Sequence, residues 1–284
     1  MKIKIYLIIA CSLLFQNAYS QFTDNFTDSN YTANPVWSGE IAKYEINAAK
    51  QLHLNAPAQT DTAYLSTASA AINNAVWNFY VGMTFNPSSG NYAKIYLVSD
   101  QANLRGSLNG YFVKVGNTTD EISLYRQDGL TETEIINGIN GRVNTSAVTS
   151  NIKVTRDTLG NWQLLSDTTG GTTFVVEGSV FDNTYIASAY FGVSSRYTST
   201  RSTKFFYDNF NVTGTAFVDN VPPVVDSLIV VNSTQLNAYF NETVDLTTSQ
   251  ILSNYAVNLG IGNPSSATRD AVDSSLVHLT FTTP

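Results

Sequence analysis

A regular alternation of apolar and polar side chains between Ala75 and Phe85 is the feature that most constrains the fold of this chain. Its apolar members are Trp77, Phe79, Val81, Met83 and Phe85. Because successive side chains of a strand point to opposite faces, the segment predicts a β-strand with one wholly apolar face. A shift of pairing by one residue would expose that whole face, so the sequence itself fixes the register of the strand.

Short runs of the same kind continue from residue 22 to about residue 214, separated by clusters of Gly, Asn, Asp and Ser. The further predicted strands are residues 92–98, 110–115, 121–127, 151–156, 162–166, 173–178, 186–194 and 204–212. Residues 157–161 and 167–171 predict hairpin loops between them. No segment shows a convincing helical period of 3.6 residues. The pattern is typical of an antiparallel sandwich or barrel and predicts an all-β protein.

The N-terminus predicts export. Lys2 and Lys4 precede an uncharged apolar run over residues 5–15, and Ala18-Tyr19-Ser20 supplies the small-x-small pattern of a signal peptidase site. The apolar run is too short for a membrane span, which needs roughly 20 residues. We expect cleavage before Gln21 and an extracellular or cell-surface location.

Cys11 raises the alternative of a lipoprotein anchor, but the apolar run continues beyond it, which disfavours that alternative. It is the only cysteine, so the mature chain would have no disulfide and no catalytic thiol. The remaining histidines, His53 and His278, fall in different predicted domains. A histidine-based triad or a zinc site with several histidines is therefore not expected.

The charge balance excludes two classes of partner. Without Lys2 and Lys4, the 15 basic residues fall to 13 against 22 acidic ones, which is a net charge of −9. A nucleic-acid-binding protein needs a basic patch to displace counterions from phosphates, and an anionic lipid surface also attracts basic segments. We therefore expect neither nucleic acid nor an anionic lipid surface as a partner. The short apolar run of residues 5–15 argues against a membrane-spanning segment, and the oligomeric state stays open.

A change of texture near residue 215 predicts a domain boundary. Val221-Pro222-Pro223 forms a stiff extended link. The predicted organisation is a signal peptide at 1–20, a β-sandwich at 21–214, a linker at 215–223 and an incomplete immunoglobulin-like domain at 224–284. Strand-like runs in the last part are residues 227–231, 235–240, 255–259 and 276–281. Because an immunoglobulin-like sandwich needs about seven strands, we expect the natural protein to continue beyond residue 284.

The tripeptide Asp-Asn-Phe occurs twice, beginning at Asp24 and at Asp208, in the first and last strands of the predicted sandwich. Jelly-roll-like sandwiches often bring their terminal strands together, so we expect the two tripeptides to lie close in space. The simpler interpretation is two edge turns with packed phenylalanines. The alternative is a structural calcium ion bound by Asp24 and Asp208, because carboxylate oxygens are the hard ligands that calcium prefers. No cofactor is otherwise required.

Several motifs carry a resemblance to a known family. They are Tyr-Leu-Val-Ser-Asp-Gln-Ala-Asn-Leu at 96–104, Leu-Asn-Gly-Tyr-Phe at 108–112, Leu-Tyr-Arg-Gln-Asp-Gly at 124–129 and Phe-Phe-Tyr-Asp-Asn-Phe at 205–210. In this order they resemble the N-terminal region of large secreted Bacteroidota proteins described as lamin tail domain-containing proteins. The resemblance implies a concanavalin A-like, laminin-G-type jelly-roll sandwich followed by a bacterial Ig-like module, with a lamin-tail-type domain further on. It implies no catalytic residues.

Concanavalin A-like folds include both lectins and laminarinase-type hydrolases, so the fold does not decide the function. Such hydrolases carry their carboxylates at alternating positions of one strand, because acid and nucleophile must flank a single glycosidic bond. No Glu-x-Asp-x-x-Glu run is present. Glu132 and Glu134 are two residues apart, but they lie in residues 129–138, which we interpret as a solvated loop. We therefore expect no enzyme activity.

A binding face has more support. If the apolar side chains of four consecutive strands point inward, their neighbours form a solvent-side face of aromatic rings and lysines. These residues are Tyr80, Tyr92, Lys94, Tyr96, Phe112, Lys114 and Tyr125. Rings with polar edges suit sugars, which have apolar C–H faces and hydroxyl rims. The alternative is cross-strand pairing that only stabilises the sheet.

The leading hypothesis is thus a non-catalytic secreted or surface module that binds a glycan or cell-surface polysaccharide, or serves as an adhesive spacer. The second is an accessory region of a larger secreted enzyme whose catalytic domain lies elsewhere. A laminarinase-like hydrolase is the least favoured.

Overall fold

A computed structural model of the protein describes residues 21–258 and 260–282. These residues form two compact units that divide between Phe217 and Val218. The signal peptide predicted for residues 1–20 lies outside the described residues. In the described ranges, no helix has both the length and the apolar character needed to cross a membrane.

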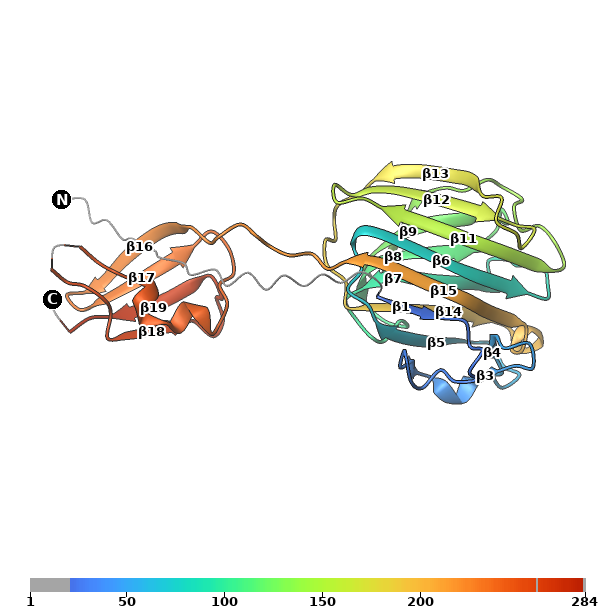
Figure 1. Cartoon of the computed structure of the whole chain (residues 1–284), viewed down its shortest axis with the longest axis horizontal. Coiled ribbons are helices and arrows are strands. Elements are labelled where there is room, and N and C mark those ends of the chain that lie inside the picture. Colours follow the sequence, from blue (N-terminus) through green and yellow to red (C-terminus); the bar gives the residue numbers. More distant parts are fainter. Residues whose placement is uncertain (1–20, 259, 283–284) are drawn as a thin grey trace. The chain divides into compact units, whose positions relative to one another are not determined.

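The first unit is a sandwich of two antiparallel sheets (Figure 1). The order in the eight-stranded sheet is β13 (Val175–Phe181), β12 (Asn161–Asp167), β11 (Val148–Arg156), β6 (Asn73–Met83), β15 (Phe205–Thr215), β4 (Leu52–Leu54) and β3 (Tyr44–Ile46), with β1 (Phe22–Asp24) also paired to β15. The order in the seven-stranded sheet is β10 (Thr131–Ile136), β9 (Ile122–Gly129), β8 (Leu108–Val115), β7 (Tyr92–Ser99), β14 (Tyr190–Tyr197), β5 (Asp61–Ala68) and β2 (Ser38–Gly39). The all-β prediction is confirmed.

The core lies between the two sheets. The apolar face predicted for β6 is buried throughout, with Trp77, Phe79 and Val81 at most 2% exposed. Ile95 of β7 and Val113 of β8 belong to the same core cluster, from the facing sheet. Each such side chain contributes about 1.5–3 kcal/mol by leaving water, so this layer accounts for much of the stability of a unit that has no disulfide. The predicted direction of each of these side chains is confirmed.

Two local predictions have different outcomes. The hairpin between β11 and β12 is confirmed, because Arg156 pairs with Trp162 and the Asp157 carboxylate accepts hydrogen bonds from the backbone N–H groups of Leu159 and Asn161. The solvated loop at 129–138 is wrong. Residues 131–136 form β10, an outer strand held by its ladder to β9 and by the buried side chain of Ile136.

The second unit contains one four-stranded antiparallel sheet in the order β16 (Val225–Asn232), β17 (Gln235–Phe240), β19 (Leu276–Thr280) and β18 (Ser266–Arg269). The strand predicted at 255–259 is wrong where it is described. Tyr255 follows the short 3-10 helix η4 (Leu252–Asn254), and Val257 makes only an isolated bridge to Gly262, because the asparagines and glycines around them favour turns. An immunoglobulin-like sandwich stays a prediction for this unit.

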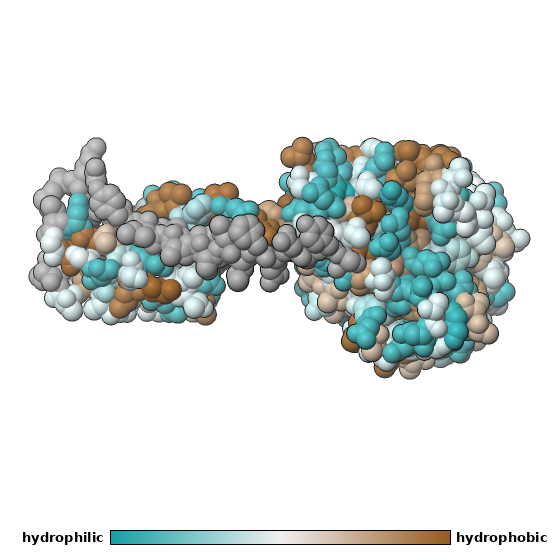
Figure 2. All heavy atoms as spheres, viewed as in Figure 1, coloured by the Kyte–Doolittle hydropathy of each residue, from teal (hydrophilic) through white to brown (hydrophobic). Residues whose placement is uncertain are grey.

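The surface of the sandwich in the view of Figure 2 is mainly hydrophilic over the middle of the eight-stranded sheet, with hydrophobic side chains gathered at the edge that carries β13. Val176 and Phe181 of that strand are 49% and 66% exposed. The polar middle shows that the outer face of the eight-stranded sheet is exposed to water.

Candidate functional site

The structure divides the predicted binding face between two sheets. Six of its members lie on the outer face of the seven-stranded sheet, on β7, β8 and β9: Tyr92, Lys94, Tyr96, Phe112, Lys114 and Tyr125. Tyr80 lies on β6 of the other sheet, where it pairs with Asn151 and Asp208. The prediction that Tyr80 belongs to this face is wrong. Alternation shows which side chains of a strand share a face, but it does not show to which sheet the strand belongs, and the chain changes sheets between β6 and β7.

Four of these side chains are buried, which the sequence did not predict. Tyr96 is 2% exposed, Phe112 0%, Tyr125 8% and Lys94 8%. The three rings form a second apolar cluster with Leu104 and Leu108, separate from the core between the sheets. Phe112 stacks on Tyr125 at 5.2 Å between ring centroids and lies tilted against Tyr96 at 5.1 Å. The aromatic face that the sequence predicts to be exposed is therefore largely buried.

The cover is the loop of residues 100–107, which joins β7 to β8. Leu104 packs into the apolar cluster and is 3% exposed. Ser66 Oγ donates a hydrogen bond to the Ala102 carbonyl at 2.8 Å, and Gln127 Nε2 donates one to the Gly106 carbonyl at 3.2 Å. Both donors come from strands of the sheet beneath, so the loop is fixed over the outer face at several points.

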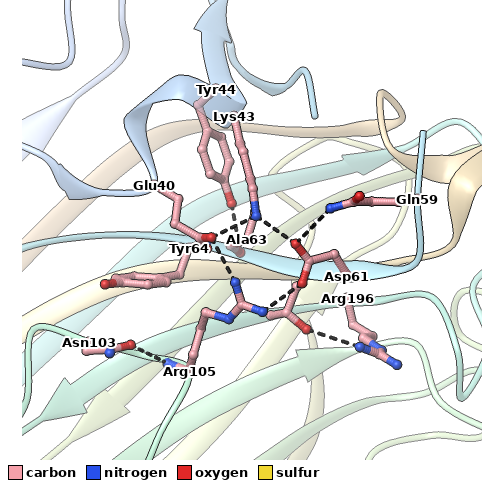
Figure 3. A network of polar contacts seen from close by, with 11 residues as sticks. Glu40, Lys43, Tyr44, Gln59, Asp61, Ala63, Tyr64, Asn103, Arg105 and Arg196 are labelled. Carbon is pink, nitrogen blue, oxygen red and sulfur yellow. Dashed lines mark hydrogen bonds and ion pairs between the residues drawn. The ribbon is translucent and has the colours of Figure 1, made fainter. Parts of the chain in front are cut away.

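An ion network holds the tip of this loop (Figure 3). Arg105 donates to Glu40 at 2.8 Å and to Asp61 at 2.7 Å, and Lys43 Nζ lies 2.7 Å from each of the same two carboxylates. The hydrogen bond from Lys43 holds the pKa of Asp61 well below its usual range. Because each carboxylate is shared by two cations, the network fixes the position of the Arg105 side chain.

Beside the loop lies a hollow of about 240 Å³. It is lined by Thr62, Tyr92, Lys94, Tyr96, Leu104, Arg105, Gly106, Gln127, Leu130, Glu132, Ser194 and Arg196. Strands β5, β7, β9, β10 and β14 all contribute to it, together with the cover loop. The hollow combines two tyrosine rings with hydroxyl, amide and charged groups. We call it the outer-face hollow.

Charged groups in the hollow are partly paired. Lys94 forms an ion pair with Glu132, and its ammonium lies 4.4 Å from the centre of the Phe112 ring. Burial lowers the pKa of Lys94, and the negative charge of Glu132 acts in the opposite direction. Lys114 Nζ lies 4.3 Å from the centre of the Tyr92 ring, a cation–π contact that covers one face of that tyrosine.

The tyrosine hydroxyls are neutral hydrogen-bonding groups. Tyr96 donates to Gln127 Oε1 at 2.9 Å, and Tyr125 donates to Glu134 Oε1 at 3.0 Å. Burial raises the pKa of Tyr92, and the charge of Glu132 raises it further. Tyr92 is therefore protonated at neutral pH and can donate to a ligand oxygen, whereas Tyr96 is already committed to Gln127.

Sequence reasoning missed Arg105 and Arg196 as residues of the hollow, and it assigned Glu132 to a solvated loop. For Arg196 a signal was present. Extending the alternation of residues 186–194 by two positions, with Val193 inward, places Ser194 and Arg196 outward on the same strand. No comparable local signal exists for Arg105 or Glu132, because each reaches the hollow through contacts distant in sequence.

The two Asp-Asn-Phe tripeptides lie side by side, as predicted. β1 pairs with β15 so that Asp24 is opposite Phe210, and the Phe26 and Phe210 rings are 5.9 Å apart. Asp24 accepts hydrogen bonds from Trp37 Nε1 at 2.8 Å and from the Phe26 N–H at 3.0 Å. These contacts give Asp24 a structural role, because they hold the end of β1 against Trp37 and Phe26.

The same place has some features of a cation site. Burial raises the pKa of Asp24, and burial together with the charge of Asp24 raises the pKa of Asp208. A divalent cation would offset both effects. A neighbouring hollow of about 500 Å³ is bordered mainly by Asn, Asp and Thr side chains. Within the described residues, however, no group of three or more His, Cys, Asp or Glu is arranged around a common point. Calcium at Asp24 and Asp208 stays a prediction.

That prediction has a direct thermal test. At 100 times its dissociation constant, a ligand of the native state adds about 2.7 kcal/mol, which for a domain of this size is roughly 5–10 °C in Tm. Protein prepared with calcium should melt lower by that amount in excess chelator. An Asp208→Asn variant should lose the response. An equal Tm with calcium and with chelator would reject the site.

No protein-family model matches the chain, and its sequence matches no curated protein. Solved structures do match its fold. The exoplasmic/lumenal domain of VIP36 in its Ca²⁺/Man₃GlcNAc-bound form has a TM-score of 0.51 and 12% identity, covering 73% of this chain and 93% of that domain. A legume lectin-like domain from Entamoeba histolytica has a TM-score of 0.50 and 9% identity, covering 69% of this chain and 96% of that domain.

These likenesses define the class of fold. At 9–12% identity they show a shared architecture and nothing finer. The first unit is a legume-lectin-like β-sandwich, which confirms the concanavalin A-like fold predicted from the sequence. The likeness transfers no binding residue to this chain, so the function has to be argued from the outer-face hollow itself.

Proposed function

We propose that the chain is a non-catalytic glycan-binding module and that the outer-face hollow is its binding site. The observation that carries this proposal is the meeting of Tyr92 and Tyr96 with Gln127, Ser194 and Thr62 in one surface hollow. The Tyr92 ring can pack against the C–H face of a sugar, and the hydroxyl groups of Thr62 and Ser194 can bind its hydroxyl rim. Tyr96 and Gln127 are buried and hydrogen-bonded to each other, and they form the floor of the hollow.

The size of the hollow limits the ligand. Pockets that enclose a drug-sized molecule have volumes of roughly 300–1,000 Å³. At about 240 Å³ the outer-face hollow is smaller. It suits one sugar residue, at the end or on a branch of a glycan, with the rest of the glycan in solvent. The cover loop is already fixed to the sheet, so little conformational entropy is lost when the ligand binds.

The fold adds support of a general kind. The VIP36 domain, which shares this architecture, is described in a form bound to Man₃GlcNAc. Sugar binding is therefore compatible with such a sandwich, although fold alone never establishes function. Export, and membership of the secreted lamin tail domain-containing proteins of Bacteroidota, belong to the same proposal: the unit would display a glycan-binding site outside the cell as part of a larger protein.

The non-catalytic part of the proposal rests on the state of the two candidate carboxylates. Glu132 and Glu134 do share one face of β10, as alternating residues of a strand. Glu132, however, is neutralised by Lys94, and Glu134 accepts the hydrogen bond of Tyr125. We expect no release of reducing ends from β-glucan. Release that disappears in Glu132→Gln would establish a hydrolase instead.

Removing the Tyr92 ring tests the site. We expect Tyr92→Ala to weaken glycan binding at least tenfold, because the variant loses the ring that lines the hollow. The measurement is a glycan-array screen followed by titration calorimetry on the sugars that bind. Tyr80→Ala is the matched control, since Tyr80 is also a half-buried strand tyrosine but lies on the other sheet. Equal losses in both variants, or no binding by the parent chain, would overturn the proposal.

A further inference from the structure

We infer that the glycan bound in the outer-face hollow carries an anionic group, a carboxylate or a sulfate, and that Arg196 binds it. This inference rests on the proposed function and specifies the class of sugar. It follows from which charges in the hollow are compensated and which are not.

Arg196 is on β14, directly opposite Tyr92 of β7 on one side and Thr62 of β5 on the other. Its side chain is half-buried, and its hydrogen bond to Thr62 Oγ1 is long, at 3.5 Å. Among the residues that the structure describes, no carboxylate lies within 4.0 Å of its guanidinium. Arg196 thus lines the hollow with most of its five donors unused.

The other basic side chains of the hollow are compensated. Lys94 is paired with Glu132, and Arg105 with both Glu40 and Asp61. Lys114 does not line the hollow; it lies in the field of Glu132, Glu121 and Glu134 and packs on Tyr92. The positive charge left over in the hollow is therefore that of Arg196.

An uncompensated, half-buried guanidinium has a cost, because it gives up part of its hydration without an ion pair in return. A ligand anion would supply the missing partner. The planar fork of arginine matches a carboxylate or sulfate with two parallel hydrogen bonds, which are stronger than bonds between neutral groups. Tyr92, opposite Arg196 in the ladder, would lie against the ring that carries this anion.

The charge of the whole chain sharpens the argument. The net charge of −7 repels acidic polysaccharides in general, so an acidic sugar needs a local positive group to be held at all. A neutral sugar has no such need, and the hydroxyl, amide and aromatic groups of the hollow would suffice for it. The placement of a free guanidinium in this hollow therefore favours an acidic ligand over a neutral one.

The test uses trisaccharides of glucose, mannose and galactose, each in a neutral, a C6-carboxylated and a 6-O-sulfated form, titrated into the chain from residue 21 onward. We expect an acidic form to bind at least tenfold more tightly than its neutral counterpart, with the preference decreasing at high salt. The carboxylated and sulfated forms show which anion is recognised.

Substitutions at Arg196 complete the test. Arg196→Gln should remove the preference, so that the acidic and neutral forms bind with equal affinity, and Arg196→Lys should restore part of the preference. An unchanged Tm in both variants controls for folding. Equal affinity for matched neutral and acidic sugars, with both weakened by Tyr92→Ala, would overturn the anionic ligand and leave glycan binding standing. A preference that persists in Arg196→Gln would overturn the role of Arg196. No binding by any member of the panel would instead overturn the proposed function, and this inference with it.

Discussion

Phe112→Ala should destabilise the sandwich by about 3–5 kcal/mol, the usual cost of removing a fully buried phenylalanine. Phe112 is 0% exposed and lies between Tyr96 and Tyr125. Its ring also forms the surface on which the Lys94 ammonium rests. The substitution would leave a cavity beneath the outer-face hollow and release Lys94 and its partner Glu132. We therefore expect a loss of glycan binding together with the loss of stability.

Denaturant unfolding followed by tryptophan fluorescence measures the loss of stability. Titration with a glycan that binds the parent chain measures the loss of binding. Phe112→Leu is the matched control, because it retains most of the apolar volume but not the aromatic face. It should cost less than about 1.5 kcal/mol if repacking is easy, as for other volume-conserving changes. A Phe112→Ala variant with nearly unchanged stability would mean that this second cluster is not packed as described.

The inward faces of the strands were predictable from the sequence, and the reason is local. Each of Trp77, Phe79 and Val81 is two residues from the next, so the pattern that buries them is written within a single strand. In the facing sheet, Ile95 follows Ala93 by two residues in β7, and Val113 precedes Val115 by two residues in β8. A one-residue slip would expose the entire apolar set, and the penalty for that leaves one solution for each strand.

The outer face could not be predicted in the same way, because its burial depends on contacts between distant residues. Arg105 reaches Glu40, 65 residues earlier, and Lys94 reaches Glu132, 38 residues later. Alternation correctly placed Tyr96 and Phe112 away from the core between the sheets. It could not show that the loop of residues 100–107 covers them. It also could not show that β6 and β7 belong to different sheets, which is why Tyr80 does not lie at the site.

The two Asp-Asn-Phe tripeptides show how a repeat can compensate for missing local information. Nothing around Asp24 or Asp208 specifies a partner strand. Their pairing was predicted because terminal strands of jelly-roll-like sandwiches tend to meet, and the register places the tripeptides together. The pairing does not decide between the two interpretations of the tripeptides. Packing of Phe26 against Phe210 and a calcium ion between the carboxylates would both place the same residues side by side.

A second large effect is expected at Glu177, a buried carboxylate of the outer strand β13 that sequence reasoning did not single out. The side chain of Glu177 is 0% exposed and pairs with Arg142 Nε at 2.7 Å. It also accepts hydrogen bonds from the Ile139 N–H at 2.9 Å and from Ser166 Oγ. Ile139 and Arg142 belong to the segment that leads from β10 of one sheet to β11 of the other. Glu177 thus fastens the edge at which the chain crosses between the sheets.

Glu177→Ala should therefore destabilise the sandwich by about 3 kcal/mol, the lower end of the cost of breaking a buried ion pair, because Arg142 retains some access to water. Glu177→Gln is the control: its amide oxygen can still accept from the Ile139 N–H, while the charge and the acceptor that faces Arg142 Nε are lost, so it should cost about half as much. Hydrogen exchange locates the effect, with faster exchange expected first in residues 137–147 and in β13. Exchange that instead rises evenly over both sheets would show that Glu177 supports the fold as a whole. A cost below about 1 kcal/mol for Glu177→Ala would mean that backbone and apolar contacts hold the segment between β10 and β11.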